Sequence, residues 1–205
     1  MINVAGSILL WFLPEAWFQV HLLAPDAEER MAERLRERFG AGEIPEELLE
    51  ELIASEVMVA RQAAADGVIL LATYSEGEPG PAEIPAGLSL TLAVAQVPTT
   101  PSLGQATPFT ETGGSAGFAS SVVPLALADP ELKAFSRETR SEVDIPGRDE
   151  LLTQFQAQVF VVPADETVTA VVTVTTFGAD WEDRARTVAR TFADTLVFVS
   201  PPGEE

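Results

Sequence analysis

Alternating apolar and polar positions predict most of the strands in this chain. Residues 87–97 place Leu90, Leu92 and Val94 on one face, as a half-buried strand does. Residues 167–177 are apolar on both faces, which is typical of a central strand, and a turn at 163–166 joins them to residues 151–162 as a hairpin. We expect further strands at 68–74, at 118–127 with an interruption at Pro124, at 135–145 as an exposed or edge strand, and at 195–199.

The first two strands are predicted to form a hairpin. Residues 8–13 and 16–23 are rich in aromatic and aliphatic side chains that favour strands. The segment Leu13-Pro14-Glu15-Ala16 between them is typical of a tight turn. We therefore expect these two strands to pair with each other.

Apolar residues recurring every three to four positions predict three helices. The first spans residues 26–39 and buries Met31, Leu35 and Phe39. The last spans residues 180–194 and is expected to bury four residues, namely Trp181, Ala185, Val188 and Phe192. Three arginines of this last helix are expected to face away from the core: Arg184, Arg186 and Arg190.

The second helix runs from Pro45 to about Asp66, and Gly67 ends it. Its apolar face is expected to contain Leu48, Leu49, Leu52, Ile53, Met58 and Val59. The glutamates of its first turns are expected on the opposite, solvated face, where the helix dipole favours negative charge: Glu46, Glu47, Glu50 and Glu51. A solvated helix start is favoured over calcium binding or acid–base chemistry by these carboxylates.

A long polar segment at 98–115 has no regular apolar period. A loop of this length inside a compact domain is usually functional or disordered. We treat residues 1–200 as one domain with this loop as an excursion, and residues 201–205 as a loose acidic tail. The loop is the candidate partner-binding segment, with Thr99, Thr100, Ser102, Phe109, Glu111 and Phe118 as its candidate residues.

The net charge of the chain limits the kinds of macromolecule that it is expected to bind. The 205 residues include 12 basic and 32 acidic side chains, a formal net charge of −20 at pH 7. Such a field repels phosphate backbones, so nucleic-acid binding is not expected. It attracts a basic protein partner, although an acidic surface also serves solubility alone. The oligomeric state stays open.

The hydropathy of the chain predicts no membrane insertion. The apolar run at residues 8–13 is shorter than the ~20 residues that a spanning helix needs, and no basic residue precedes it as in a signal peptide. We therefore expect a cytoplasmic protein. The arginine-rich and nearly lysine-free composition resembles that of proteins from high-GC bacteria.

One motif suggests catalysis. Gly113-Gly114-Ser115-Ala116-Gly117 matches the G-x-S-x-G nucleophile elbow, which needs a strand before the serine and a histidine after it in the chain. The single histidine, His21, precedes the serine, so the usual base is missing. The candidate groups of an enzyme would be Ser115, His21, Asp144 and Asp149, and its chemistry would have to rely on carboxylates or on a bound metal. We expect no catalysis.

Metal and cofactor sites are not expected either. The chain has no cysteine, which excludes disulfides, thiolate-ligated zinc and iron–sulfur clusters, and one histidine makes a transition-metal site unfavourable. A small ligand could bind between the sheet and the helices. Its pocket would be lined by aromatic residues that more often belong to a plain core: Trp11, Phe12, Trp17, Trp181 and Phe192.

The order of elements predicts an α+β fold, a mostly antiparallel sheet flanked by helices. The segment Phe12-Leu13-Pro14-Glu15-Ala16-Trp17-Phe18 is similar to the LP-x-x-W hairpin that often opens Mog1/PsbP-like domains. The final strand, helix and short strand, at 168–177, 180–194 and 195–198, resemble the end of such domains. This resemblance implies a Mog1/PsbP-like sandwich that binds proteins and has no shared catalytic residues.

These observations favour a non-catalytic protein-binding module, an adaptor, chaperone or accessory subunit of a bacterial assembly. An immunity-type inhibitor of a basic toxin is an alternative, because acidic side chains speed association with such a partner. Two further functions stay open at this point: binding of a small ligand, and catalysis by carboxylates.

Overall fold

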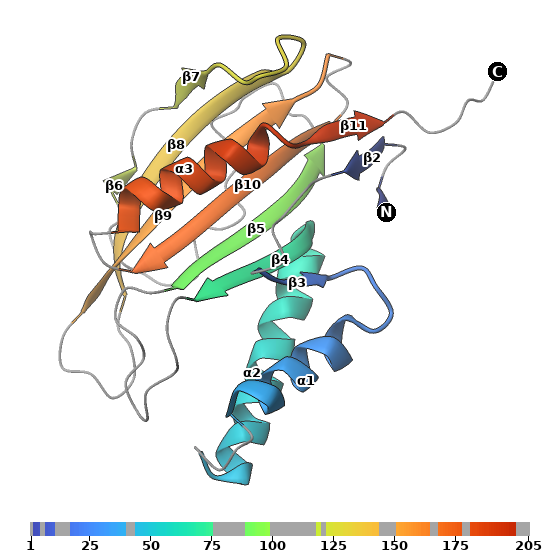
Figure 1. Ribbon diagram of the computed structural model, residues 1–205, viewed down its shortest axis with the longest axis vertical. Coiled ribbons are helices and arrows are strands. Elements are labelled where there is room, and N and C mark those ends of the chain that lie inside the picture. The colour runs from blue at the N-terminus through green and yellow to red at the C-terminus, as the bar shows by residue number, and fades with distance from the viewer. Residues whose placement is uncertain are drawn as a thin grey trace.

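An antiparallel sheet of eight strands organises the part of the chain that the structure describes (Figure 1). This computed structural model describes residues 2–4, 7–10, 17–39, 44–75, 89–98, 118–119, 122–143, 151–164, 168–177 and 181–199. The strands follow one another as β3 (Phe18–His21), β4 (Val68–Ser75), β5 (Ser89–Pro98), β10 (Val168–Phe177), β9 (Leu152–Val162) and β8 (Lys133–Val143). Two short strands, β6 (Phe118–Ala119) and β7 (Val123–Leu125), pair with the outer side of β8. The antiparallel sheet and its helices confirm the α+β class.

The hairpin of β9 and β10 lies in the middle of this sheet, as the sequence predicts. β10 pairs with β9 on one side and with β5 on the other. Both of its faces are buried, because consecutive residues such as Val171 and Val172 are each almost inaccessible to solvent. Its apolar residues on both faces therefore match its central position.

β8 lies inside the sheet, which corrects the expectation of an exposed or edge strand. It pairs with β9 along its whole length on one side. On the other side, β7 pairs with residues 134–136 and β6 with residues 139–140, so β8 is covered there in part. Pro124 does not interrupt a strand but lies within β7. A proline can occupy this edge strand because its missing N–H has no partner to lose there. The alternation of β8 is misleading because one polar residue that it places on a sheet face, Arg137, is buried.

A second sheet of three strands corrects the predicted first hairpin. It contains β1 (Ile2–Val4), β2 (Ser7–Leu10) and β11 (Val197–Val199), in the order β1-β2-β11. β2 therefore pairs with β1 and β11, whereas β3 pairs with β4. Side-chain propensity identifies a strand but not its partner, which depends on contacts distant in the sequence.

The last helix, α3 (Glu182–Ala193), lies across one face of the large sheet (Figure 1). Trp181, Ala185 and Phe192 are buried as predicted, and Val188 is partly buried. Alternate residues of the strands beneath complete the main core, among them Leu70, Leu92, Val94, Phe155, Val159 and Val172.

One arginine that was expected to face away from this core reaches the sheet instead. Arg186 Nε donates to Glu138 Oε1 of β8 at 2.7 Å, and Arg186 Nη1 donates to Asp183 Oδ1 at 2.6 Å. Its guanidinium lies 4.8 Å from the ring centre of Phe155. The long apolar stem of arginine allows this, because it can lie along α3 while the charged end stays at the margin of the core.

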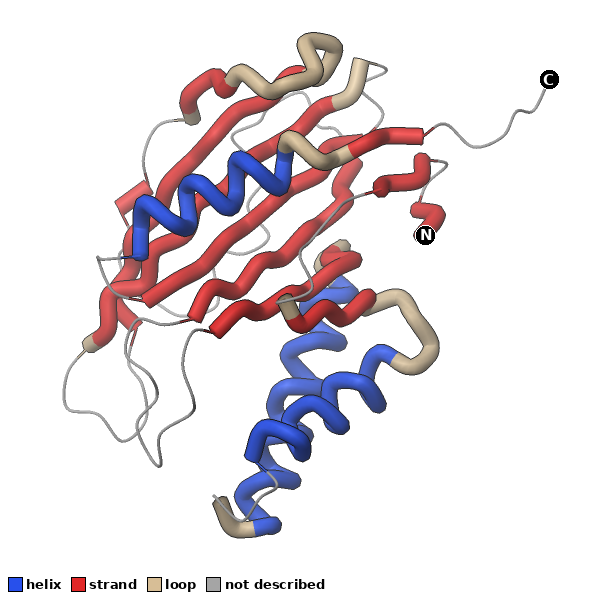
Figure 2. The backbone as a smooth tube through the Cα atoms, in the orientation of Figure 1, coloured by secondary structure: helices blue, strands red, loops and turns tan. Residues whose placement is uncertain are grey.

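Two helices form a hairpin between the neighbouring strands β3 and β4. These are α1 (Ala27–Phe39) and α2 (Glu46–Ala65), with bounds close to those predicted. The hairpin projects beyond the β3–β4 edge of the sheet (Figures 1 and 2). Ala27 and Met31 of α1 and Ala60 of α2 pack with Val20 of β3 at its inner end. Gly67 ends α2 at a φ of +90°, as a glycine after a helix commonly does.

The predicted loop falls almost entirely outside the described residues. β5 continues to Pro98, so the first residue of the expected 98–115 loop is in a strand. The rest of that loop and the tail at 201–205 lie outside the described part of the chain.

Candidate functional site

The second helix exposes about half of the apolar residues that its sequence predicts to be buried. Leu49 and Ile53 are buried, whereas Leu48, Met58 and Val59 are 51%, 65% and 55% exposed. Leu48, Leu52 and Val59 lie within about 40° of one another around the helix, because they are separated by four and seven residues. We call these three residues the α2 stripe; Met58 lies farther around the helix, about 80° from Leu48. Clustered apolar residues on a projecting surface are typical of an interaction site.

Carboxylates flank the α2 stripe on two sides. At 100° per residue, Glu51 lies about 60° from Leu48 on one side, and Glu56 lies beyond Leu52 on the other. The position of Glu51 corrects the expectation that the helix glutamates lie opposite the leucines, whereas Glu46 and Glu50 each lie about 160° from Leu48. In the described part of the chain, Glu51 and Glu56 form no ion pair, so their charges are free to meet a partner.

The charge of the hairpin is concentrated on α2. Its sequence contains five glutamates and one arginine, whereas α1 contains four glutamates and four arginines. Glu50 is neutralised by Arg36 of α1, whose Nη2 and Nε donate to Glu50 Oε1 at 3.1 and 3.3 Å. Of the four other glutamates of α2, Glu51 and Glu56 flank the α2 stripe.

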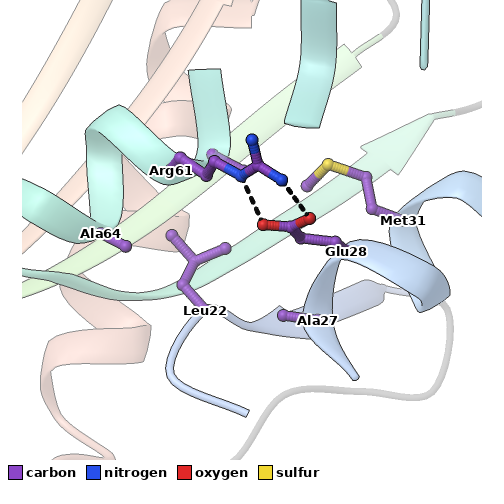
Figure 3. A pocket seen from close by; sticks show the side chains of 7 residues that line it. Leu22, Ala27, Glu28, Met31, Arg61 and Ala64 are labelled. Atoms are coloured by element: carbon purple, nitrogen blue, oxygen red, sulfur yellow. Dashed lines mark hydrogen bonds and ion pairs between the residues drawn. The ribbon is translucent and has the colours of Figure 1, made fainter. Parts of the chain in front are cut away.

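A second ion pair fixes the two helices near the sheet (Figure 3). Arg61 Nε and Nη2 donate to the two carboxylate oxygens of Glu28 at 2.6 and 2.7 Å. These hydrogen bonds lower the pKa of the Glu28 carboxyl and raise the pKa of Arg61. Both side chains are exposed, so the pair contributes little stability and chiefly sets the geometry between the helices.

A small hollow lies beside this ion pair between α1, α2 and the segment after β3 (Figure 3). Its volume is about 150 Å³, and its walls are mostly apolar, with Leu22, Met31 and Ala60 among them. Pockets for small ligands usually enclose about 300–1,000 Å³, so this hollow has room for one inserted side chain rather than a metabolite. Ala60 and Arg61 lie at least about 100° around α2 from Val59, so the hollow opens away from the α2 stripe.

The residues predicted to bind a partner are not gathered by the described structure. Thr99, Thr100, Ser102, Phe109 and Glu111 lie outside the described residues. Phe118 begins β6, where its backbone is opposite Arg140 of β8. The loop therefore stays a prediction.

The catalytic candidates are likewise not brought together. Ser115, Asp144 and Asp149 lie outside the described residues. His21 ends β3 and is half-buried, and burial is the main cause that lowers its pKa. Among the described residues, no group of three or more histidine, aspartate or glutamate side chains is placed to hold a metal ion.

The described aromatic residues considered for a ligand pocket all pack in or against the main core. Trp181 and Phe192 belong to the core under α3. Trp17 packs on Tyr74 of β4, with ring centres 5.5 Å apart. Trp11 and Phe12 lie outside the described residues. The described aromatics thus fill the core, and they do not converge on one cavity.

Sequence reasoning missed the α2 stripe, although a signal was present. The six apolar residues of α2 span far more than the roughly 100° stripe that one buried face occupies. When apolar residues spread over a wider angle than one buried face can cover, some of them form a second apolar surface on the helix.

No family model, curated protein or solved structure matches this chain. In the described part, no helix has the length and apolar character that crossing a membrane requires.

Proposed function

We propose that this protein is a non-catalytic protein-binding module, an adaptor, chaperone or accessory subunit, and that it binds its partner through the helical hairpin. The observation that carries this proposal is the α2 stripe on a projecting helix, where Leu48 and Val59 are exposed and Leu52 between them is partly buried. A monomeric soluble protein has little reason to keep Leu48 and Val59 exposed on one helix face unless another surface covers them.

The partner that fits this surface is a basic amphipathic helix. Its apolar side chains would cover the α2 stripe, in the manner of a helix that lays its apolar face on an apolar groove. Its lysines or arginines would meet Glu51 and Glu56, which have no ion-pair partner among the described residues. The net charge of −20 would speed the encounter with such a partner.

We further propose a Mog1/PsbP-like arrangement for the sheet and α3. The order β10, α3, β11 supports it, because the helix crosses the sheet between a long central strand and a short last strand. The helical hairpin is then an insertion between two adjacent strands, and it supplies the binding surface.

A pair of synthetic peptides tests the proposed function. One is a fluorescent helix of about 18 leucine and lysine residues, long enough to be helical, and the other replaces each lysine with glutamate. We expect the basic peptide to bind, as fluorescence anisotropy would measure, and the acidic peptide not to bind. At about 1 M salt, where the Debye length is ~3 Å, the affinity should fall but not vanish, because the apolar contact remains.

Two matched double variants separate docking from charge attraction. Leu48→Glu with Val59→Glu replaces the two exposed residues of the α2 stripe and makes the protein more acidic, and we expect at least about tenfold weaker binding of the basic peptide. Val123→Glu with Leu151→Glu adds the same charge at positions that are 52% and 56% exposed elsewhere, and it should bind at least as well as the wild type. Equal binding by both variants would contradict the proposal.

A further inference from the structure

The sheet face opposite α3 carries a polar row across three strands. Arg137 of β8, Gln158 of β9 and Thr173 of β10 are direct neighbours in the strand register. They are only 8%, 2% and 5% exposed. Arg137 Nε and Nη2 donate to Gln158 Oε1 at 2.9 and 2.6 Å, and Gln158 Nε2 donates to Thr173 Oγ1 at 3.2 Å. The row is therefore a hydrogen-bonded chain inside the molecule.

The charge of Arg137 has no counter-ion in the described part of the chain. Its polar contacts there are the two hydrogen bonds to the neutral Gln158, and its guanidinium lies 5.8 Å from the ring centre of Phe160. Burial lowers the pKa of Arg137, whereas hydrogen bonds to carboxylates raise the pKa of Arg186. A buried cation without an anion opposes folding. None of the acidic side chains in the described part of the chain pairs with this cation, and we therefore consider an external anion as its partner.

The free edge of the guanidinium indicates which anion fits. One oxygen of Gln158 occupies the edge formed by Nε and Nη2. The opposite edge carries Nη1 and the second hydrogen of Nη2, two parallel N–H groups that make no hydrogen bond to a described residue. This fork matches the two oxygens of a carboxylate. Gln158 holds the guanidinium in place, so little side-chain entropy is lost when the anion binds.

We propose that Arg137, held by Gln158 and Thr173, binds the carboxylate group of a small organic acid. The site lies on β8, β9 and β10, and the proposed partner surface lies on α2. The two proposals therefore rest on different observations and can fail separately.

Nitrogen-15 NMR of the arginine side chains tests this site with acetate as the probe. The Nε–H signal of Arg137 is assigned by its loss in Arg137→Lys. We expect acetate to shift this signal saturably, and acetamide, which has the same shape without the charge, to leave it in place. No shift with acetate would overturn the proposal. A shift with inorganic phosphate as large as that with acetate would overturn the assignment to a carboxylate.

An isosteric pair of variants provides a second readout that does not depend on the assignment. Gln158→Glu places a carboxylate at the oxygen that Arg137 already contacts, so we expect the acetate response to disappear and the melting temperature to rise by a few degrees. Gln156→Glu adds the same charge on the same face, one register row away from Arg137, and should keep the acetate response. If Gln158→Glu retains the acetate response, or melts below Gln156→Glu, the proposal is wrong.

Discussion

At the residue scale, α3 is held to the sheet by guanidinium groups that combine charge and packing. Arg186 of α3 donates to Glu138 of β8 and to Glu182 of its own helix. Arg140 of β8 donates to Glu182 as well, with Nε 2.8 Å from Oε1. Both guanidiniums lie over the ring of Phe155, at 4.8 and 5.1 Å from its centre. Because the same groups provide fork-like hydrogen bonds and ring contacts, they fix the position of α3 along β8.

We expect Arg186→Gln to lower the free energy of unfolding by about 1–2 kcal/mol near neutral pH, since the side chain is 34% exposed and its ion pairs are partly screened. Hydrogen bonds from Arg140 and, more weakly, Arg186 lower the pKa of the Glu182 carboxyl. A lowered carboxyl pKa stabilises the fold above the pKa of the unfolded chain, and this stabilisation is lost as the pH falls through the folded pKa. The difference between the wild type and the variant in urea unfolding should therefore shrink from about pH 7 to about pH 3.

Asp183→Asn is the matched control for this prediction. Asp183 also accepts a hydrogen bond from Arg186, but its side chain is 96% exposed. We expect its replacement to change the free energy of unfolding by less than about 0.5 kcal/mol. An equal loss in both variants, or a loss in Arg186→Gln that persists at low pH, would show that the contacts of Arg186 with β8 do not hold α3.

At the element scale, the helices follow from the sequence because their signals are local. Apolar spacing and end residues place α1, α2 and α3 within a few positions of the observed bounds. Strand pairing is not local. The segments at 8–13 and 16–23 look like a hairpin, yet β2 pairs with β1 and β11, whereas β3 pairs with β4 at the end of the large sheet. Which strand occupies an edge depends on the whole topology and not on the turn alone.

The difference between local signals and contacts distant in the sequence also explains why the candidate sites were not predicted. The apolar residues of α2 are visible in the sequence, but the burial of Leu49 and the exposure of Leu48 depend on where α1 packs. Arg137 lies in a strand rich in polar residues, and such a sequence predicts side chains that face solvent. Only the register with Gln158 and Thr173 shows that this arginine is buried without an acidic neighbour in the described structure.

The link between α2 and β4 gives a test of the hairpin as an element. Gly67 has a φ of +90°, and a Cβ added there would lie 3.1 Å from the carbonyl oxygen of Gln96. The strand β5 is also held here by the Gln96 N–H, which donates to the Gly67 carbonyl at 3.0 Å. We expect Gly67→Ala to lower the free energy of unfolding by about 1–2 kcal/mol, because the left-handed conformation is strained for a residue with a Cβ.

Asp66→Ala controls for the loss of a polar residue at the same helix end. Asp66 is exposed and has a φ of −84°, which alanine adopts without strain. Chemical unfolding should place this variant within about 0.5 kcal/mol of the wild type. If Gly67→Ala is equally stable, the junction between α2 and β4 is not constrained as described.

At the scale of the whole molecule, the described structure divides into a sheet core and a projecting hairpin. The main core under α3 contains no residue of α1 or α2. The hairpin contacts the sheet through its inner end, where Met31, Ala60 and Ala63 pack against strand residues. Its outer end is joined by Arg36 and Glu50, an exposed ion pair that contributes little stability. A module built in this way can present the α2 stripe without disturbing the sheet.

This division predicts that the outer end of the hairpin opens without the sheet. Native-state hydrogen exchange read by mass spectrometry should show residues 46–55 of α2 exchanging at least about tenfold faster than β10, whose backbone bonds to strands on both sides. Arg36→Gln should speed exchange in residues 46–55 a few-fold and leave β10 unchanged. Glu37→Gln, which breaks only a pair within α1, is the matched control and should have a smaller effect. Equal protection of α2 and β10 would mean that the hairpin and the sheet unfold together, and that covering the α2 stripe with a partner would stabilise the whole molecule rather than the hairpin alone.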